Sequence, residues 1–167
     1  MRERTRAGTF HELYERDHRA VVALAYALSG SRSAAEELAQ EAFLAAFRAW
    51  DRIGGYDDPG AWVRRVVANR SVSRFRRAAA EARALTRVGN RRELPAELPD
   101  GSAAFWAAVR RLPAQQATVV ALYYVEDRST ADIAAVLDLA EGTVRAHLHK
   151  ARRSLAAALA VDPGEDA

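Results

Sequence analysis

The chain has 167 residues, of which 50% are hydrophobic and 28% are charged, so it can bury a core and remain soluble. It contains no cysteine, which excludes disulfides and thiolate metal sites and fits a reducing compartment. The net charge is only +3, but residues 62–92 hold ten arginines and a single acid, Glu81. This basic block indicates a polyanionic partner, most often nucleic acid; the alternative is a solvated helix face.

The sequence gives no sign of a membrane protein. Its longest apolar stretch, residues 20–28, is far too short to span a bilayer. Charged residues such as Glu3 and Glu12 interrupt the N-terminus, so no signal peptide is expected. These features predict a cytoplasmic protein with no membrane partner.

Alanine, leucine, arginine and glutamate dominate the composition, and this favours an all-α fold. We predict two small helical domains joined by a flexible linker. In the N-terminal domain, residues 1–80, apolar residues recur at helical spacing in three segments. The expected helices cover residues 9–28, 33–50 and 61–80, with a loop over residues 51–60. Thr9 with Glu12 and Ser33 with Glu36 are the expected capping boxes.

The helical periodicity fades over residues 81–101, where glycine, proline and acidic residues predict a linker. The second domain is expected over residues 102–160 and is followed by an acidic tail, residues 161–167. Its expected helices cover residues 102–111, 113–124, 130–137 and 141–159.

Residues 129–144 read as a short helix, a tight turn and a longer helix. Asp138 sits at the turn, where a left-handed backbone is needed and aspartate tolerates one. On the last helix an apolar stripe falls on one face: Val144, Leu148, Ala151 and Leu155. A cationic face lies beside it and suits the DNA major groove; the alternative is an ordinary surface helix.

Nothing in the sequence predicts a catalytic site, a metal site or a bound cofactor. His147 and His149 stand two residues apart, on different faces of a helix, and lack a nearby carboxylate or thiolate, so we expect no metal site. No nucleophile–base pair, phosphate loop or carboxylate dyad is visible. We therefore expect neither an enzyme nor a small-molecule substrate.

The C-terminal segments LPAQQ (112–116), YYVE (123–126), EGTVR (141–145) and KARRSL (150–155) resemble the promoter-reading domain of bacterial sigma-70 family sigma factors, in particular the extracytoplasmic-function (ECF) group. The output domains of response regulators contain a similar four-helix unit. The choice between these two families therefore depends on the N-terminal half of the chain. The resemblance implies contacts with the duplex minus-thirty-five element through Thr143, Arg145, His149, Lys150, Arg152 and Arg153.

The segment AEELAQEAF (35–43) is similar to the sigma-factor helix that docks on core RNA polymerase. The resemblance assigns this docking to Glu37, Leu38, Gln40 and Glu41. Glu37 and Glu41 are one helical turn apart, and Gln40 beside them can add directional hydrogen bonds. A solvated face with paired charges is the alternative. Ala34 replaces an aspartate common in the family.

The segment WVRRVVANRSVSRFRR (62–77) looks like the helix that meets the minus-ten element, and residues 51–59 resemble the loop that captures an extruded base. The implied contacts are Tyr56, Asp57, Asp58, Arg65, Asn69, Ser73, Arg76 and Arg77. Ser73 stands where many relatives have a carboxylate. Val63, Val67 and Phe75 are expected in the core, and Trp62 as a core anchor rather than a stacking platform.

The resemblance implies a dissociable initiation subunit that binds core RNA polymerase and promoter DNA, and it makes an anti-sigma protein an expected partner. One alternative is a stand-alone helix-turn-helix regulator that binds an operator as a dimer. Another is an all-α adaptor whose basic surface meets an acidic protein, which leaves the cationic last helix unexplained.

Overall fold

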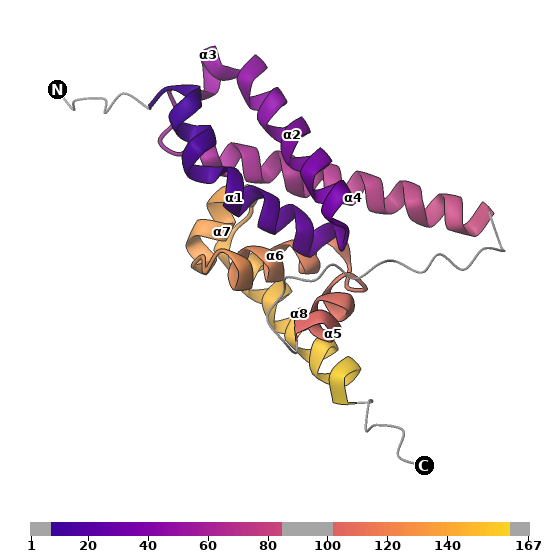
Figure 1. Cartoon of the computed structure of the whole chain (residues 1–167). Coiled ribbons are helices and arrows are strands. Elements are labelled where there is room, and N and C mark those ends of the chain that lie inside the picture. Colours follow the sequence, from indigo (N-terminus) through magenta and orange to yellow (C-terminus); the bar gives the residue numbers. More distant parts are fainter. Residues whose placement is uncertain (1–7, 85–101, 161–167) are drawn as a thin grey trace.

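The computed structural model describes residues 8–84 and 102–160, and every regular element in these ranges is an α-helix (Figure 1). The predicted all-α fold is thus confirmed. Most of the expected linker and the expected tail lie outside the described residues, as does the side chain of Phe75. No helix within the described ranges is long and apolar enough to cross a membrane.

The helices fall into an N-terminal and a C-terminal half. The first half contains α1 (Phe10–Ser29), α2 (Arg32–Arg48), α3 (Trp50–Ile53) and α4 (Pro59–Ala84). The second contains α5 (Ser102–Val109), α6 (Ala114–Val125), α7 (Thr130–Leu137) and α8 (Glu141–Ala160). Helix α4 continues four residues into the segment expected to be a linker.

Local capping sets the start of each of the first two helices. The predicted capping box of α1 is present: the Thr9 amide donates to Glu12 at 2.6 Å, and the Glu12 amide donates to the Thr9 hydroxyl at 3.3 Å. The expected cap at Ser33 is wrong. Gly30 ends α1 with φ 69°, and Ser31 then accepts a hydrogen bond from the Ala34 amide at 3.3 Å. The N-cap of the second helix therefore lies two residues earlier than predicted, and the helix begins at Arg32.

The expected loop over residues 51–60 is shorter than predicted. It is interrupted by α3, and α4 already begins at Pro59, because proline has no amide hydrogen to leave unsatisfied in a first turn. The Asp58 carboxylate accepts a hydrogen bond from the Ala61 amide at 3.0 Å and so caps this helix.

The helix-turn-helix forms as predicted. Asp138 adopts a left-handed backbone with φ 57° and ψ 49°, and the Leu139 amide donates to the Ala134 carbonyl at 3.0 Å. Ser129 caps α7 by accepting a hydrogen bond from the Asp132 amide at 3.1 Å. The turn brings α7 against α8.

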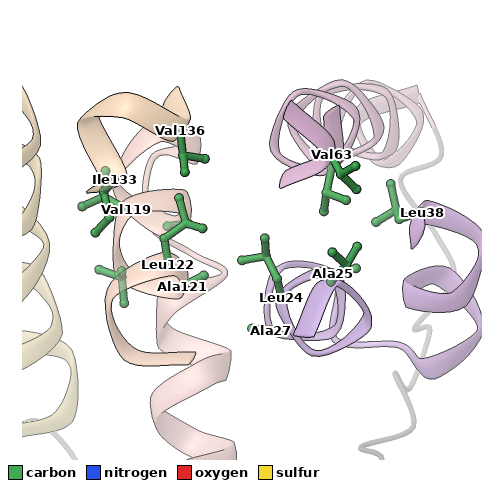
Figure 2. Close-up of a cluster of buried hydrophobic side chains, with 14 of the residues drawn as sticks. Leu24, Ala25, Ala27, Leu38, Val63, Val119, Ala121, Leu122, Ile133 and Val136 are labelled. Carbon is green, nitrogen blue, oxygen red and sulfur yellow. The ribbon is translucent and has the colours of Figure 1, made fainter. Parts of the chain in front are cut away.

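The two halves share one hydrophobic core. Helix α1 packs on α6, and α4 packs on α7 (Figure 1). Leu24 of α1 points toward Leu122 of α6 between the halves (Figure 2), and both side chains are fully buried. Val63 and Val67 are fully buried, as predicted. We call this packing of α1 and α4 on α6 and α7 the closed arrangement.

Candidate nucleic-acid interface

The last helix, α8, presents a cationic face to solvent. Its predicted apolar stripe is buried: Val144 and Ala151 are fully buried, and Leu148 and Leu155 are about as inaccessible, at 4% and 5%. The residues predicted to meet the minus-thirty-five element are all exposed: Thr143, Arg145, His149, Lys150, Arg152 and Arg153. A rigid amphipathic helix of this kind can enter a major groove with its basic side chains forward.

Two of these arginines are held in place by neighbours. Arg145 donates to Glu141 at 2.6 Å, and Glu141 also accepts from the Thr130 hydroxyl at 2.7 Å; these hydrogen bonds lower the pKa of the Glu141 carboxyl. Arg152 donates to the Tyr124 hydroxyl at 3.2 Å, which raises the pKa of the guanidinium. The contact of Tyr124 with Arg152 was not predicted, because the two residues lie 28 positions apart and no local pattern links them.

The Arg152 guanidinium also stacks on an aromatic ring, with its carbon 5.1 Å from the centroid of Tyr123. Such a cation–π contact restricts the arginine to one side of α8. His147 is half-buried and His149 exposed. No group of three or more histidine or acidic residues within residues 8–84 and 102–160 is arranged to hold a metal ion.

Helix α4 carries a second basic surface. The predicted minus-ten residues Asn69, Ser73, Arg76 and Arg77 are exposed on it. The Ser73 hydroxyl donates a hydrogen bond within its own helix, to the Asn69 carbonyl at 3.1 Å. Its oxygen can still accept a hydrogen bond from a partner. Trp62 is half-buried and packs against the core, which agrees with its prediction as an anchor.

Arg65, also predicted to meet the minus-ten element, is engaged elsewhere. Its Nε donates to the Val136 carbonyl at 2.7 Å, and a terminal nitrogen donates to the Ala135 carbonyl at 3.0 Å. Both acceptors are carbonyls at the end of α7, in the other half of the molecule. In the closed arrangement the side chain of Arg65 is therefore not available to DNA.

The predicted base-capturing loop borders a cavity of about 560 Å³. Tyr56, Asp57 and Asp58 are all exposed, but only Asp57 and Asp58 line this cavity. Arg64 of α4 and Arg128, which follows α6, line it as well. The cavity is thus walled by both halves and carries charges of both signs.

The predicted docking residues on α2 separate into two groups. Glu37 and Gln40 are exposed and Glu41 is partly exposed, whereas Leu38 is 1% exposed. The prediction that Leu38 contributes to a surface is not met in this structure, because it lies about 100° around the helix from Glu37 and faces the core. Leu38 instead packs α2 against the hydrophobic core.

Two apolar residues that were not among the predicted docking residues are exposed on α2. Leu44 is 48% exposed and Phe47 is 60% exposed. They follow Gln40 at steps of four and three residues, so the three side chains share one face. The spacing alone could have indicated them.

The acidic residues of α2 are paired with arginines of α4. Arg70 lies 2.8 Å from Glu41, and Arg74 lies 2.6 Å from Glu41 and 3.0 Å from Glu37. Burial raises the pKa of the Glu41 carboxyl, but hydrogen bonds and charge from the two arginines outweigh it and hold this pKa below its usual value.

A buried ion network connects the two halves. Arg64, 5% exposed, donates through Nε to both carboxylate oxygens of Glu126, at 2.8 and 2.6 Å. A terminal nitrogen of Arg64 lies 3.4 Å from Asp17 of α1. Arg128 also donates to Glu126, at 2.6 Å, and Arg16 donates to Asp17 at 3.1 Å. No local pattern in the sequence predicts this network.

The pKa of the Asp17 carboxyl is set by burial and by two neighbouring arginines. Burial raises the pKa of its carboxyl, while the hydrogen bond from Arg16 and the charge of Arg64 lower it. The net pKa lies below the usual value of 3.8. Asp17 is therefore ionised at neutral pH and compensates part of the buried charge of Arg64.

Known proteins match both halves of the chain in this order. Residues 13–81 match the family Sigma-70 region 2, and residues 102–155 match Sigma-70, region 4. The chain is 32% identical over 148 residues to the ECF RNA polymerase sigma factor SigM of Mycobacterium tuberculosis, covering 88% of this chain and 75% of that protein. The chain belongs to the ECF sigma factors. As a sigma factor it directs transcription initiation by RNA polymerase, and the stand-alone regulator is not favoured.

Other similarities support the same family for this sigma factor. It is 27% identical to the ECF sigma factor SigW of Bacillus subtilis, with 79% of each chain covered. Its fold matches the sigma factor RpoE, solved with the anti-sigma factor NepR from Bartonella quintana, with a TM-score of 0.74 and 26% identity over 92% of this chain and 98% of that one. CnrH, solved with the cytosolic domain of CnrY, matches with a TM-score of 0.65 and 25% identity over 92% and 88%.

Proposed function

We propose that this sigma factor divides promoter recognition between two helices on two functional units, residues 1–80 and 102–160. Helix α8 reads the duplex minus-thirty-five element. Helix α4, with the loop before it, binds the minus-ten element, and α2 docks on core RNA polymerase. The chain contributes binding alone, and the polymerase forms the bonds.

The exposed basic face of α8 is the observation that carries this proposal. Arginine pairs with guanine edges or phosphates, and lysine adds charge near the backbone. Because Arg145 and Arg152 are oriented by Glu141 and Tyr124, they lose less conformational freedom on binding than unrestrained side chains would.

The minus-ten proposal is supported by exposure. Asn69, Arg76 and Arg77 are exposed on α4, where they can meet a melted strand. Asp57 and Asp58 are exposed in the loop before α4 and offer polar groups to a base that has left the stack.

The docking proposal is supported by the exposed face of α2. Gln40 offers a directional hydrogen bond, Leu44 and Phe47 add apolar contact, and Glu37 and Glu41 supply negative charge for a basic partner surface. The proposed docking residues differ from the predicted ones: the buried Leu38 is left out, and the exposed Leu44 and Phe47 are added.

Regulation by a protein antagonist is also proposed. The RpoE structure contains an anti-sigma factor, and the match covers nearly the whole of both chains. The proposed site of action is the cytoplasm, where RNA polymerase transcribes.

A charge reversal on α8 tests the central assignment. The double variant Arg145→Glu, Arg152→Glu is assayed by run-off transcription with core polymerase and a promoter library. Transcript from minus-thirty-five-dependent promoters should fall at least about tenfold, since two contacts of about 1–3 kcal/mol each are lost. Association with core polymerase should not change.

The matched control is Arg111→Glu, an exposed charge reversal between α5 and α6. It should retain transcription close to the unsubstituted level. Full transcription by the double variant, with normal binding to core, would show that α8 does not read the promoter.

A further inference from the structure

The first turn of α8 carries an acidic residue beside the basic face that is proposed to read the promoter. We propose that Glu141 determines the sequence specificity of α8 by withholding Arg145 from phosphates and directing it to the edges of bases. Glu141 acts through Arg145 and is therefore a positioning residue. This role rests on the proposed function of α8.

Glu141 joins the starts of the two helices of the helix-turn-helix. Its Oε1 accepts a hydrogen bond from the Thr130 hydroxyl of α7 at 2.7 Å and another from a terminal nitrogen of Arg145 at 2.6 Å. The carboxylate therefore lies between a hydroxyl on α7 and an arginine one turn further along α8. Since α7 and α8 pack against each other, this hydroxyl gives the carboxylate a defined place, and the carboxylate gives one to the guanidinium.

The contact with Glu141 leaves most donors of Arg145 unused. A guanidinium has five N–H groups in a planar fork. Within the described residues, the side chain of Arg145 makes its hydrogen bond through Nη2, and it remains 67% exposed. A second edge of the fork can therefore still bind O6 and N7 of guanine, which is the commonest specific contact in a major groove.

The ion pair with Glu141 also lowers the attraction of Arg145 for DNA of any sequence. Phosphates attract cations irrespective of sequence, and each phosphate contact adds about 0.9 to the slope of affinity against salt. The Glu141 carboxylate neutralises Arg145 and repels a phosphate that approaches the same guanidinium. The acceptors of guanine carry no full charge and are repelled less. Glu141 therefore weakens the nonspecific contact of Arg145 more than its specific contact.

Gly142 indicates that this turn lies close to an external surface. Glycine destabilises a helix relative to alanine. A Cβ added to Gly142 would meet no neighbouring atom within 4 Å, so packing within the described part of the chain does not require a glycine there. Close approach of a ligand to the backbone is a reason for glycine. Because the first residues of a recognition helix contact base edges, DNA is the surface that fits, and Glu141 is adjacent to it.

The test measures the binding of holoenzyme to two DNA fragments of equal length. The first fragment is a promoter obtained from the run-off library. The second keeps its minus-ten element and has its minus-thirty-five element shuffled. Titrations over about 50–200 mM salt give the ratio of the two affinities, which we call the specificity ratio, and the salt slope of each.

The decisive variant is Glu141→Gln, and Asp138→Asn is its matched control. Asp138→Asn removes an equal charge from an exposed position in the same helix-turn-helix, and Asp138 does not bind Arg145. Asparagine also tolerates the left-handed backbone of this residue. Unchanged helical circular dichroism in both variants verifies that the fold is retained.

We expect Glu141→Gln to raise the affinity for the shuffled fragment about threefold to tenfold and to steepen its salt slope by about 0.9, because one more cation meets phosphates. The affinity for the promoter should change less, since the added attraction is offset by the lost orientation of Arg145. The specificity ratio should thus fall at least about threefold, whereas Asp138→Asn should leave it unchanged. If both variants change this ratio by the same factor, or neither changes it, the role of Glu141 is rejected.

A second comparison shows whether Glu141 acts through Arg145. In an Arg145→Gln background, Glu141→Gln should no longer lower the specificity ratio, because the interaction that it removes is already absent. An equal loss in both backgrounds would overturn the positioning role. Failure of the proposed function has a different signature, namely equal affinity of the unsubstituted holoenzyme for the two fragments. Failure of the Glu141 role alone leaves the specificity ratio high in Glu141→Gln.

Discussion

Arg74 of α4 and Glu41 of α2 form an ion pair of 2.6 Å, so a residue of the basic helix is bound to a residue of the proposed docking surface. Their side chains are 35% and 39% exposed. Exposed pairs of this kind contribute about 0–1 kcal/mol, so a basic partner surface can replace Arg74 at little cost. Docking of α2 on a basic surface is therefore expected to compete with the pairing of α2 and α4.

Gln40 offers the cleanest test of docking, because its substitution leaves the Glu41 ion pairs intact. Gln40→Ala should weaken binding to core polymerase about threefold to tenfold, the equivalent of one hydrogen bond. Fluorescence anisotropy of labelled sigma factor with core polymerase measures this. The control Gln115→Ala removes an exposed glutamine from α6 and should bind normally. Equal losses in the two variants would contradict a docking role for Gln40.

Tyr124 is expected to position Arg152. Tyr124→Phe removes the hydroxyl that accepts from Arg152 and should weaken holoenzyme binding to a minus-thirty-five promoter fragment about twofold to threefold, because the bond is exposed. A mobility-shift titration measures this. Tyr14→Phe removes an exposed phenol hydroxyl from α1 and should leave this affinity unchanged. An unchanged affinity in Tyr124→Phe would show that Arg152 needs no support.

The buried carboxylate of Asp17 makes stability depend on pH. Its pKa in the folded chain lies below 3.8, the value expected when unfolded, so its ionised form stabilises the fold. That contribution is complete above about pH 5 and disappears as the pH falls through the folded pKa. The difference in urea unfolding free energy between the unsubstituted protein and Asp17→Asn should therefore be larger at pH 7 than at pH 3. A difference that does not change with pH would contradict the stabilising role of the carboxylate.

Leu24 tests the shared core. Leu24→Ala should reduce the free energy of unfolding by about 2–5 kcal/mol, since it leaves a cavity between α1 and α6. Leu44→Ala, at a 48% exposed site on α2, should cost less than about 0.5 kcal/mol. Urea denaturation followed by circular dichroism compares them, and similar losses would mean that Leu24 does not belong to a tightly packed core.

Local signals predicted the parts of the fold that depend on neighbours in sequence. The capping box at Thr9 needs only Glu12, the turn at Asp138 needs only a tolerant residue, and the stripe from Val144 to Leu155 needs only helical spacing. The cap of α2 was misplaced because serines stand at both 31 and 33, and only the fold shows that Ser31 is the one that accepts a hydrogen bond from the first turn of the helix.

Contacts distant in sequence could not be predicted in this way. Arg64 meets Glu126 across 62 residues, and Arg65 meets Val136 across 71. Both arginines belong to one basic run, and composition does not distinguish the arginine that is buried from those that remain exposed. Leu38 was assigned to the surface for the same reason: the docking motif names its residues without showing which side of the helix is covered.

The carbonyl oxygens at the end of α7 resemble phosphate oxygens in what they offer Arg65: localised negative charge and hydrogen-bond acceptors. They engage the guanidinium of Arg65 within the molecule, so in the closed arrangement one cationic group fewer is free to meet a polyanion. DNA of any sequence attracts proteins through such cationic groups. We therefore expect the closed arrangement to bind nonspecific DNA more weakly than an arrangement in which Arg65 is released.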